Sequence, residues 1–124
     1  MTEEMTALGI RLLEAYNSRD AGVLTELLEE GAVWHSARGD QIGRAAILDL
    51  LRSVDERSGG TFRQAVHEVL ASGTHLVLLT RAIGRRGENA LDDPEVTVVH
   101  VRDGRLHEAW SHPFDQEARK RFWA

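Results

Sequence analysis

The chain of 124 residues contains no cysteine, and no apolar run in it approaches the roughly 20 residues that a membrane span needs. The absence of cysteine excludes disulfide bonds, thiolate metal sites and cysteine nucleophiles. The first residues include two glutamates and no basic stretch, so they do not resemble a secretion signal. We therefore expect a cytoplasmic protein that does not bind membranes.

An excess of positive charge is also lacking, because the formal net charge is −5. Nucleic-acid binding relies on clustered Lys and Arg, so no nucleic-acid partner is expected. The basic clusters Arg85-Arg86 and Arg119–Arg121 are small and are interpreted as solvated surface. The sequence also lacks the local metal-binding and nucleotide-binding motifs, and we expect neither a metal nor another cofactor.

The apolar content of 42% is enough for one domain over residues 1–124 to bury its own core. Apolar residues at helical spacing predict helices over residues 3–17 and about 43–58. A shorter helix is predicted between them, with Asp20 as its N-cap and Gly31 as its C-terminal stop. Three helices therefore occupy most of the first half of the chain.

The second half of the chain is rich in Val, Leu, Thr and His and predicts strands. A short strand over 32–36 and a polar loop over 37–41 come earlier. The later strands are expected over residues 61–71, 74–85, 95–102 and 105–112, separated by turn residues that include a loop over 86–94. The predicted fold class is α+β: a curved antiparallel sheet wrapped around three helices, with a cavity at its open end.

Four segments carry a family resemblance: "AYNSRDAGVLTELLEEGAVWH" (15–35), "GRAAILDLL" (43–51), "VRDGRLHEAW" (101–110) and "DQEARKRFWA" (115–124). Their order resembles the nuclear transport factor 2-like superfamily, especially its SnoaL-like polyketide-cyclase and ketosteroid-isomerase-like members. The resemblance implies a cone-shaped, cystatin-like α+β roll. It also implies a concave pocket for a small hydrophobic metabolite and a convex face that forms homodimers.

Charged residues and histidines sort to one face of the predicted sheet when residues two apart are compared. Because such groups are costly to bury unpaired, we interpret this face as the outer one. Arg81, His100 and Trp110 then lie at a homodimer surface. The alternative exchanges the two faces, since a cluster of His100, Trp110 and His112 also has the composition of an active site.

The resemblance also shows which family positions lack their usual chemistry. Leu12, Ser36 and Val99 stand where ketosteroid-isomerase-like members carry a tyrosine and two acids. Ser111 stands where SnoaL-like cyclases carry an aspartate. Ketosteroid isomerase activity is therefore not expected, and whether the protein is an enzyme stays open.

The predicted catalytic residues are His107 and His67, which can act as acid or base near neutral pH. The alternative for each is a structural histidine that is bound to a backbone carbonyl or faces water. Loop carboxylates, including Asp93 and the helix cap Asp115, are given no catalytic role. The predicted ligand contacts are Trp34, Ser36, Tyr16, Thr80, Val99 and Ser111.

The predicted function is uptake of a small apolar metabolite, with isomerisation, cyclisation or hydrolysis by histidine acid–base chemistry. A pocket of a few hundred Å³ would accept steroids, terpenes and polyketides alike. Two alternatives are a non-catalytic ligand-binding protein and a dimeric protein-interaction module.

Overall fold

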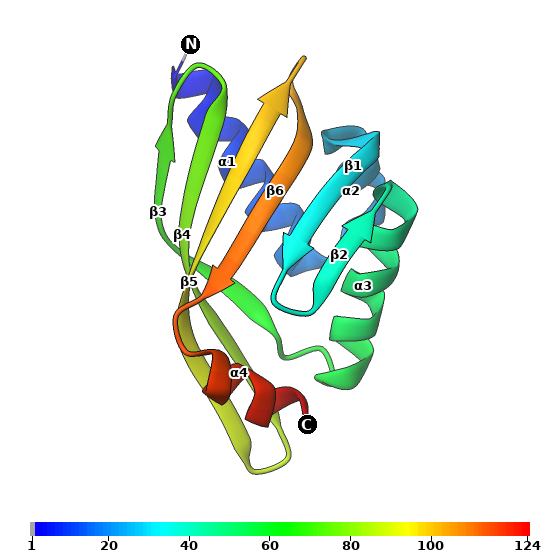
Figure 1. The fold of residues 1–124 in the computed structure, drawn as a ribbon, viewed down its shortest axis with the longest axis vertical. Coiled ribbons are helices and arrows are strands. Elements are labelled where there is room, and N and C mark those ends of the chain that lie inside the picture. Colours follow the sequence, from blue (N-terminus) through cyan, green and yellow to red (C-terminus); the bar gives the residue numbers. More distant parts are fainter. Residues whose placement is uncertain (1) are drawn as a thin grey trace.

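The computed structural model describes residues 2–124, in which one mixed sheet is covered by helices on one face (Figure 1). The elements follow one another along the chain as α1 (Thr2–Ser18), α2 (Ala21–Leu27), β1 (Leu28–Ser36), β2 (Gly39–Ile42), α3 (Arg44–Arg57), β3 (Arg63–Ala71), β4 (His75–Arg86), β5 (Asn89–Arg102), β6 (Arg105–Pro113) and α4 (Gln116–Trp123). The predicted α+β fold class is confirmed.

The sheet has the strand order β2-β1-β6-β5-β4-β3. Strands β3 to β6 form the expected antiparallel meander, and β1 and β2 form an antiparallel hairpin. The expectation of a wholly antiparallel sheet is wrong at one place, because β1 runs parallel to β6. Helix α3 connects β2, at one edge of the sheet, to β3, at the other edge. The last strand of the meander, β6, therefore lies beside β1.

Two segments expected as loops and one expected as the end of a helix are strands. Helix α2 ends at Leu27 and β1 begins at Leu28, so Gly31 lies inside the strand and is not a helix stop. Gly31 lacks the positive φ that a left-handed helix cap needs. The expected loop over 37–41 contains β2, and most of the expected loop over 86–94 continues β4 and β5 as a long hairpin arm.

Local signals that set element boundaries are largely as expected. Asp20 caps α2 by accepting a hydrogen bond from Val23 N at 3.0 Å, and Asp115 caps α4 through Ala118 N at 2.9 Å. Asp103 and Gly104 both have positive φ, as the tight β5–β6 turn requires. Within residues 2–124, no helix is long and apolar enough to cross a membrane.

The core lies between the helices and the inner face of the sheet. Its buried centre consists of Leu28, Leu76, Leu106 and Val99, each less than 2% exposed. Helix α1 approaches β3 so closely that a Cβ on Gly9 would lie 2.9 Å from a side-chain carbon of Val69. A smaller apolar cluster around Phe62 and Phe122 seals α4 against the end of the sheet.

Candidate active site

A cavity of about 140 Å³ lies between α1, α3 and the inner face of the sheet, with α4 at one end. Most of its wall is aliphatic, supplied by Leu12, Leu13, Leu24, Leu28, Ile47, Leu50, Leu51, Val54, Leu78, Val99 and Leu106. This volume is smaller than the few hundred Å³ expected from the sequence. It is comparable to engineered cavities of about 150 Å³ that hold benzene, which favours a one-ring molecule over a four-ring steroid.

All six residues predicted to contact a ligand line this cavity: Trp34, Ser36, Tyr16, Thr80, Val99 and Ser111. The alternation in β1 therefore sorts its faces as expected. The Trp34 indole N–H donates to Ser111 Oγ at 2.9 Å, and Ser111 Oγ lies 3.0 Å from Thr97 Oγ1. These bonds fix the indole plane against the cavity wall; ligand contact itself stays a prediction.

The placement of His107 and His67 on the cavity wall is wrong. Strand β6 is irregular between the pairs His100–Glu108 and Val101–Leu106, so Leu106 turns inward and His107 turns outward. The His107 ring lies 2.7 Å from a Glu29 carboxylate oxygen and edge-on to His100. A second irregularity, in β3, leaves His67 exposed and without a cross-strand partner, and it does not line the cavity.

None of the six histidines lines the cavity, so the predicted histidine chemistry has no side chain there. The alternative that exchanged the two faces is also wrong, because His100 and Trp110 lie outside on the uncovered face of the sheet. Among the described residues, no group of three or more His, Asp or Glu side chains is arranged to hold a metal ion.

The four positions that lack the family's usual acids and tyrosine do lie on the cavity wall. Leu12 and Val99 are buried apolar residues, at 6% and 0% exposure. The Ser36 hydroxyl donates to the carbonyl of Gly39 at 3.1 Å and so stabilises the β1–β2 turn. Ser111 supports Trp34. These positions thus carry packing and structural hydrogen bonds rather than ionisable groups.

The ionisable groups of the cavity stand elsewhere, in a buried network centred on Glu95 of β5. One Glu95 oxygen accepts from Arg119 Nη1 at 2.6 Å, and the other accepts from Gln64 Nε2 at 2.9 Å. The Thr80 hydroxyl in turn donates to Gln64 Oε1 at 2.7 Å. Glu95, Gln64, Thr80 and Arg119 all line the cavity, so the network presents a held carboxylate to its interior.

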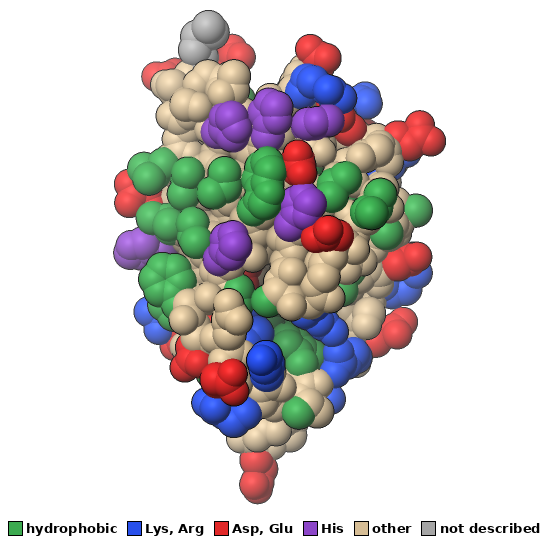
Figure 2. All heavy atoms as spheres, in the orientation of Figure 1, with side chains coloured by type: hydrophobic (Ala, Val, Ile, Leu, Met, Phe, Trp, Pro, Cys, Tyr) green, Lys and Arg blue, Asp and Glu red, His purple; other side chains and the backbone are tan. Residues whose placement is uncertain are grey.

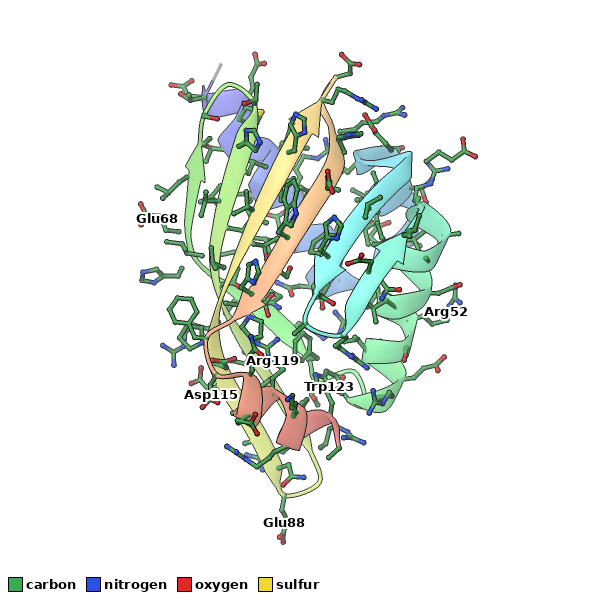
Figure 3. All side chains as sticks on the ribbon, in the orientation of Figure 1. Arg52, Glu68, Glu88, Asp115, Arg119 and Trp123 are labelled. Atoms are coloured by element: carbon green, nitrogen blue, oxygen red, sulfur yellow. The ribbon has the colours of Figure 1, made fainter. Side chains whose placement is uncertain are left out.

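Helix α4 delivers the cation of this network. Figure 3 shows Arg119 between α4 and the end of the sheet, with Trp123 further along the same helix. Arg119 Nη2 also lies 3.0 Å from Asp93, whose side chain is 3% exposed. The other Asp93 oxygen accepts from the backbone N–H of Asp115, the α4 cap. The interpretation of Arg119 as solvated surface is therefore wrong, and Asp93 joins the helix start to the network.

Tyr16 is a polar residue of the cavity wall that lies outside this network. Burial raises the pKa of its hydroxyl well above the ordinary value, and the negative charge of Glu95 adds to the shift. Nearby arginines oppose the shift without cancelling it. The hydroxyl is therefore protonated at neutral pH, and it makes no hydrogen bond with any of residues 2–124. It is a free donor beside a held carboxylate.

The alternation of residues along β5 contains a signal for Glu95. Val99 was expected at the cavity, and the same alternation along β5 continues through Thr97 to Glu95 and Asp93. Pro94 and its acidic neighbours indicated a loop, so the predicted strand began only at residue 95. The partner Arg119 carries no comparable signal, because its contact with β5 depends on how α4 packs.

The SnoaL-like domain family matches residues 10–109, and the chain belongs to this family. Bal32a, from a soil-derived mobile gene cassette, is 31% identical over 99% of this chain and 98% of its own, with a TM-score of 0.94. A protein of unknown function with a cystatin-like fold from Xanthomonas campestris is 22% identical, covering 95% and 96%, with a TM-score of 0.87.

A third similar structure is IdmH, proposed as a polyketide cyclase of Streptomyces antibioticus. It is 19% identical over 95% of this chain and 97% of its own, with a TM-score of 0.80, and this likeness concerns the fold. A search among curated proteins finds no match. The family assignment therefore rests on the matched domain over residues 10–109.

Proposed function

We propose that the protein is an acid–base enzyme of the isomerase or cyclase type that acts on a small, largely apolar carbonyl compound. The observation that carries the proposal is the pair formed by the Glu95 carboxylate and the free Tyr16 hydroxyl on one aliphatic cavity wall. An acceptor and a donor in a dry site are what proton abstraction next to a carbonyl requires.

In this mechanism Glu95 takes a proton from the carbon next to the carbonyl. Tyr16 donates a hydrogen bond to the carbonyl oxygen as it gains negative charge. In the isomerase form, Glu95 then returns the proton to another carbon of the same molecule. In the cyclase form, the new carbon nucleophile closes a ring on a second carbonyl, and Glu95 gives its proton to the oxygen of that carbonyl. Arg119 and Gln64 hold the carboxylate in place throughout, each by one hydrogen bond to one oxygen.

Proton exchange tests this proposal without knowledge of the natural substrate. Cyclohexanone and acetophenone are incubated with the protein in D₂O, and loss of the NMR signal next to the carbonyl is followed. A positioned general base accelerates such a step by about 10²–10⁴-fold, so Glu95→Gln should lose at least about 100-fold. Tyr16→Phe should lose a similar factor. Glu88→Gln, on the exposed hairpin tip in Figure 3, is the matched control.

A non-catalytic ligand-binding protein is the second candidate, and one observation favours it. Both oxygens of Glu95 already accept hydrogen bonds, so the carboxylate is restrained as well as positioned. Under this alternative, calorimetry should detect binding of both ketones. Their exchange rates with the protein in D₂O should equal the rates in the same D₂O buffer without the protein. Exchange that is accelerated and survives Glu95→Gln would instead remove Glu95 from the mechanism.

We also propose that the outer face of the sheet forms a homodimer. Histidine and hydrophobic side chains gather on this face, which no helix covers (Figure 2). Leu70, 46% exposed, belongs to an apolar cross-strand row that continues through Val77 and Val98 to the expected contact residue Trp110. Sedimentation velocity should find a dimer that Trp110→Lys weakens and Ile10→Lys, on the helical side, leaves intact. A monomeric wild type would contradict the proposal.

A further inference from the structure

The cavity has one apolar end and one polar end, and strand register fixes their order. Leu106, at the start of β6, is paired with Leu28 of β1. Pro113, at the other end of β6, is paired with Glu95. Both ends of β6 line the cavity. A ligand that fills the cavity therefore places its apolar body towards the leucines and any polar group towards Pro113 and α4.

Arg38 stands at this polar end without an ion-pair partner. It lies in the tight turn between β1 and β2 and lines the cavity. Its guanidinium takes part in no hydrogen bond and no ion pair with residues 2–124. The carboxylate of Glu95 is already bound by Arg119 and Gln64. Arg38 is therefore an exposed residue at the rim of the cavity, and its guanidinium donates to none of residues 2–124.

The surroundings of Arg38 increase the positive charge rather than balance it. Its guanidinium lies 5.1 Å from the centre of the Trp123 ring, and those of Arg57 and Arg86 lie 5.1 and 5.8 Å from the same ring. Arg57 and Arg86 donate to backbone carbonyls and form no ion pair with an acidic side chain of the described chain. Burial and the charge of Arg57 lower the pKa of Arg38.

The Trp123 ring also makes a cation–π contact with the guanidinium of Arg38. A planar cation on an aromatic face retains its in-plane N–H donors for another group. An arginine with this geometry matches the two oxygens of a carboxylate. Figure 3 shows Trp123 near the C-terminal end of α4, and Trp123 and Arg38 both line the cavity.

We propose that the ligand of this cavity is a carboxylate: a small molecule with an apolar body among the leucines and an anionic group bound by Arg38 at the rim. This inference rests on the proposed function, because it concerns the same cavity. It also orients the ligand. The carboxylate is held at Arg38, away from the negative charge of Glu95, and the carbonyl to be activated lies between the rim and the leucines.

A matched series of three probes tests the charge: 4-phenylbutanoate, 4-phenylbutan-1-ol and 4-phenylbutylamine. They share one ring and one chain length and differ in the charge of the end group. Affinities are measured by calorimetry at pH 7.5 and low salt, where exposed charges are least screened. The acid should bind the wild type about tenfold more tightly than the alcohol, the usual size of a charge-assisted hydrogen bond at a partly exposed site. The amine should bind most weakly.

Two substitutions and a control assign the preference to Arg38. Arg38→Gln should bring the acid and the alcohol to equal affinity, and Arg38→Glu should reverse the order so that the amine binds best. The control is Arg52→Gln on the outer side of α3, labelled in Figure 3, which should leave the preference unchanged. Circular dichroism checks that each variant keeps the fold.

The outcomes separate this inference from the function on which it rests. Equal binding of the three probes to the wild type would overturn the carboxylate inference and leave the cavity as a ligand site. An acid preference that survives Arg38→Gln would overturn the role of Arg38. Failure of every probe to bind would overturn both proposals. An acid preference lost only in the Arg38 variants would support the inference.

Discussion

Replacement of Arg119 by methionine is the sharpest test of the buried network. Arg119 is the cation shared by Asp93 and Glu95, and the three side chains are 12%, 3% and 8% exposed. Methionine keeps much of the volume and removes the charge. The two carboxylates are then left buried without a cation, a change that typically costs about 3–5 kcal/mol in free energy of unfolding.

The size of this effect makes it easy to measure. Domains of this length have total stabilities of about 5–15 kcal/mol, so the loss is a large fraction of the whole. At about 4 °C per kcal/mol, the midpoint of thermal unfolding should fall by roughly 12–20 °C. Urea unfolding followed by tryptophan fluorescence gives the free energy directly. Arg52→Met is the control, because Arg52 and its partner Asp49 are 66% and 69% exposed, and it should change stability by less than about 1 kcal/mol.

Two further results complete this test. The deficit of Arg119→Met should shrink as the pH is lowered, because protonation removes the uncompensated charges. Adding Asp93→Asn and Glu95→Gln to Arg119→Met should recover much of the loss, since no charge is then buried. A deficit below 1 kcal/mol, or one that does not change with pH, would show that the carboxylates find water or another partner and would refute the reasoning.

Two other predictions concern the rest of the fold. A hydrogen bond to Glu108 and a smaller contribution from a hydrogen bond to Asp40 raise the pKa of His35. The NMR titration midpoint of His35 should therefore lie above the ordinary 6.5, and it should be lower in Glu108→Gln than in the wild type. The stability from these pairs is complete below pH 6.5 and is lost as the pH rises through the raised pKa; an unchanged midpoint in the variant would contradict this. Gly9→Ala should lower the free energy of unfolding, measured by urea unfolding, by about 1–3 kcal/mol, because the added Cβ would lie 2.9 Å from a side-chain carbon of Val69. An unchanged free energy would mean that α1 shifts freely.

The sequence predicted the faces of regular strands well and failed where strands are irregular. Trp34 and Ser36 lie inside because β1 alternates without interruption over this stretch. His107 and His67 were placed inside by the same rule, but each is the residue without a cross-strand partner at an irregularity of its strand, where the alternation is interrupted. A bulge depends on how two strands pair, and one sequence without structure gives little sign of it.

Charge led to a second kind of error, about which polar residues are buried. The argument that unpaired charges avoid the interior is sound, and it placed Arg81 and His100 outside. It does not apply to charges that are paired inside, as Asp93 and Glu95 are with Arg119. That pairing joins residues 24 and 26 positions apart in the chain. No local pattern links them, so Arg119 was expected on the surface and Asp93 in a loop, where the structure has one buried network.

The polar groups of the cavity make its chemistry depend on the last helix. The family positions on α1, β1, β5 and β6 are filled by side chains that cannot take up a proton near neutral pH, such as Leu12 and Ser111. The acid that remains, Glu95, needs Arg119 to balance its charge in the interior. Arg119 reaches it only when Phe122, 2% exposed, packs α4 against the sheet. Docking of α4 therefore both closes one end of the cavity and completes its ionisable group, so loosening Phe122 should disturb ligand binding and Glu95 together.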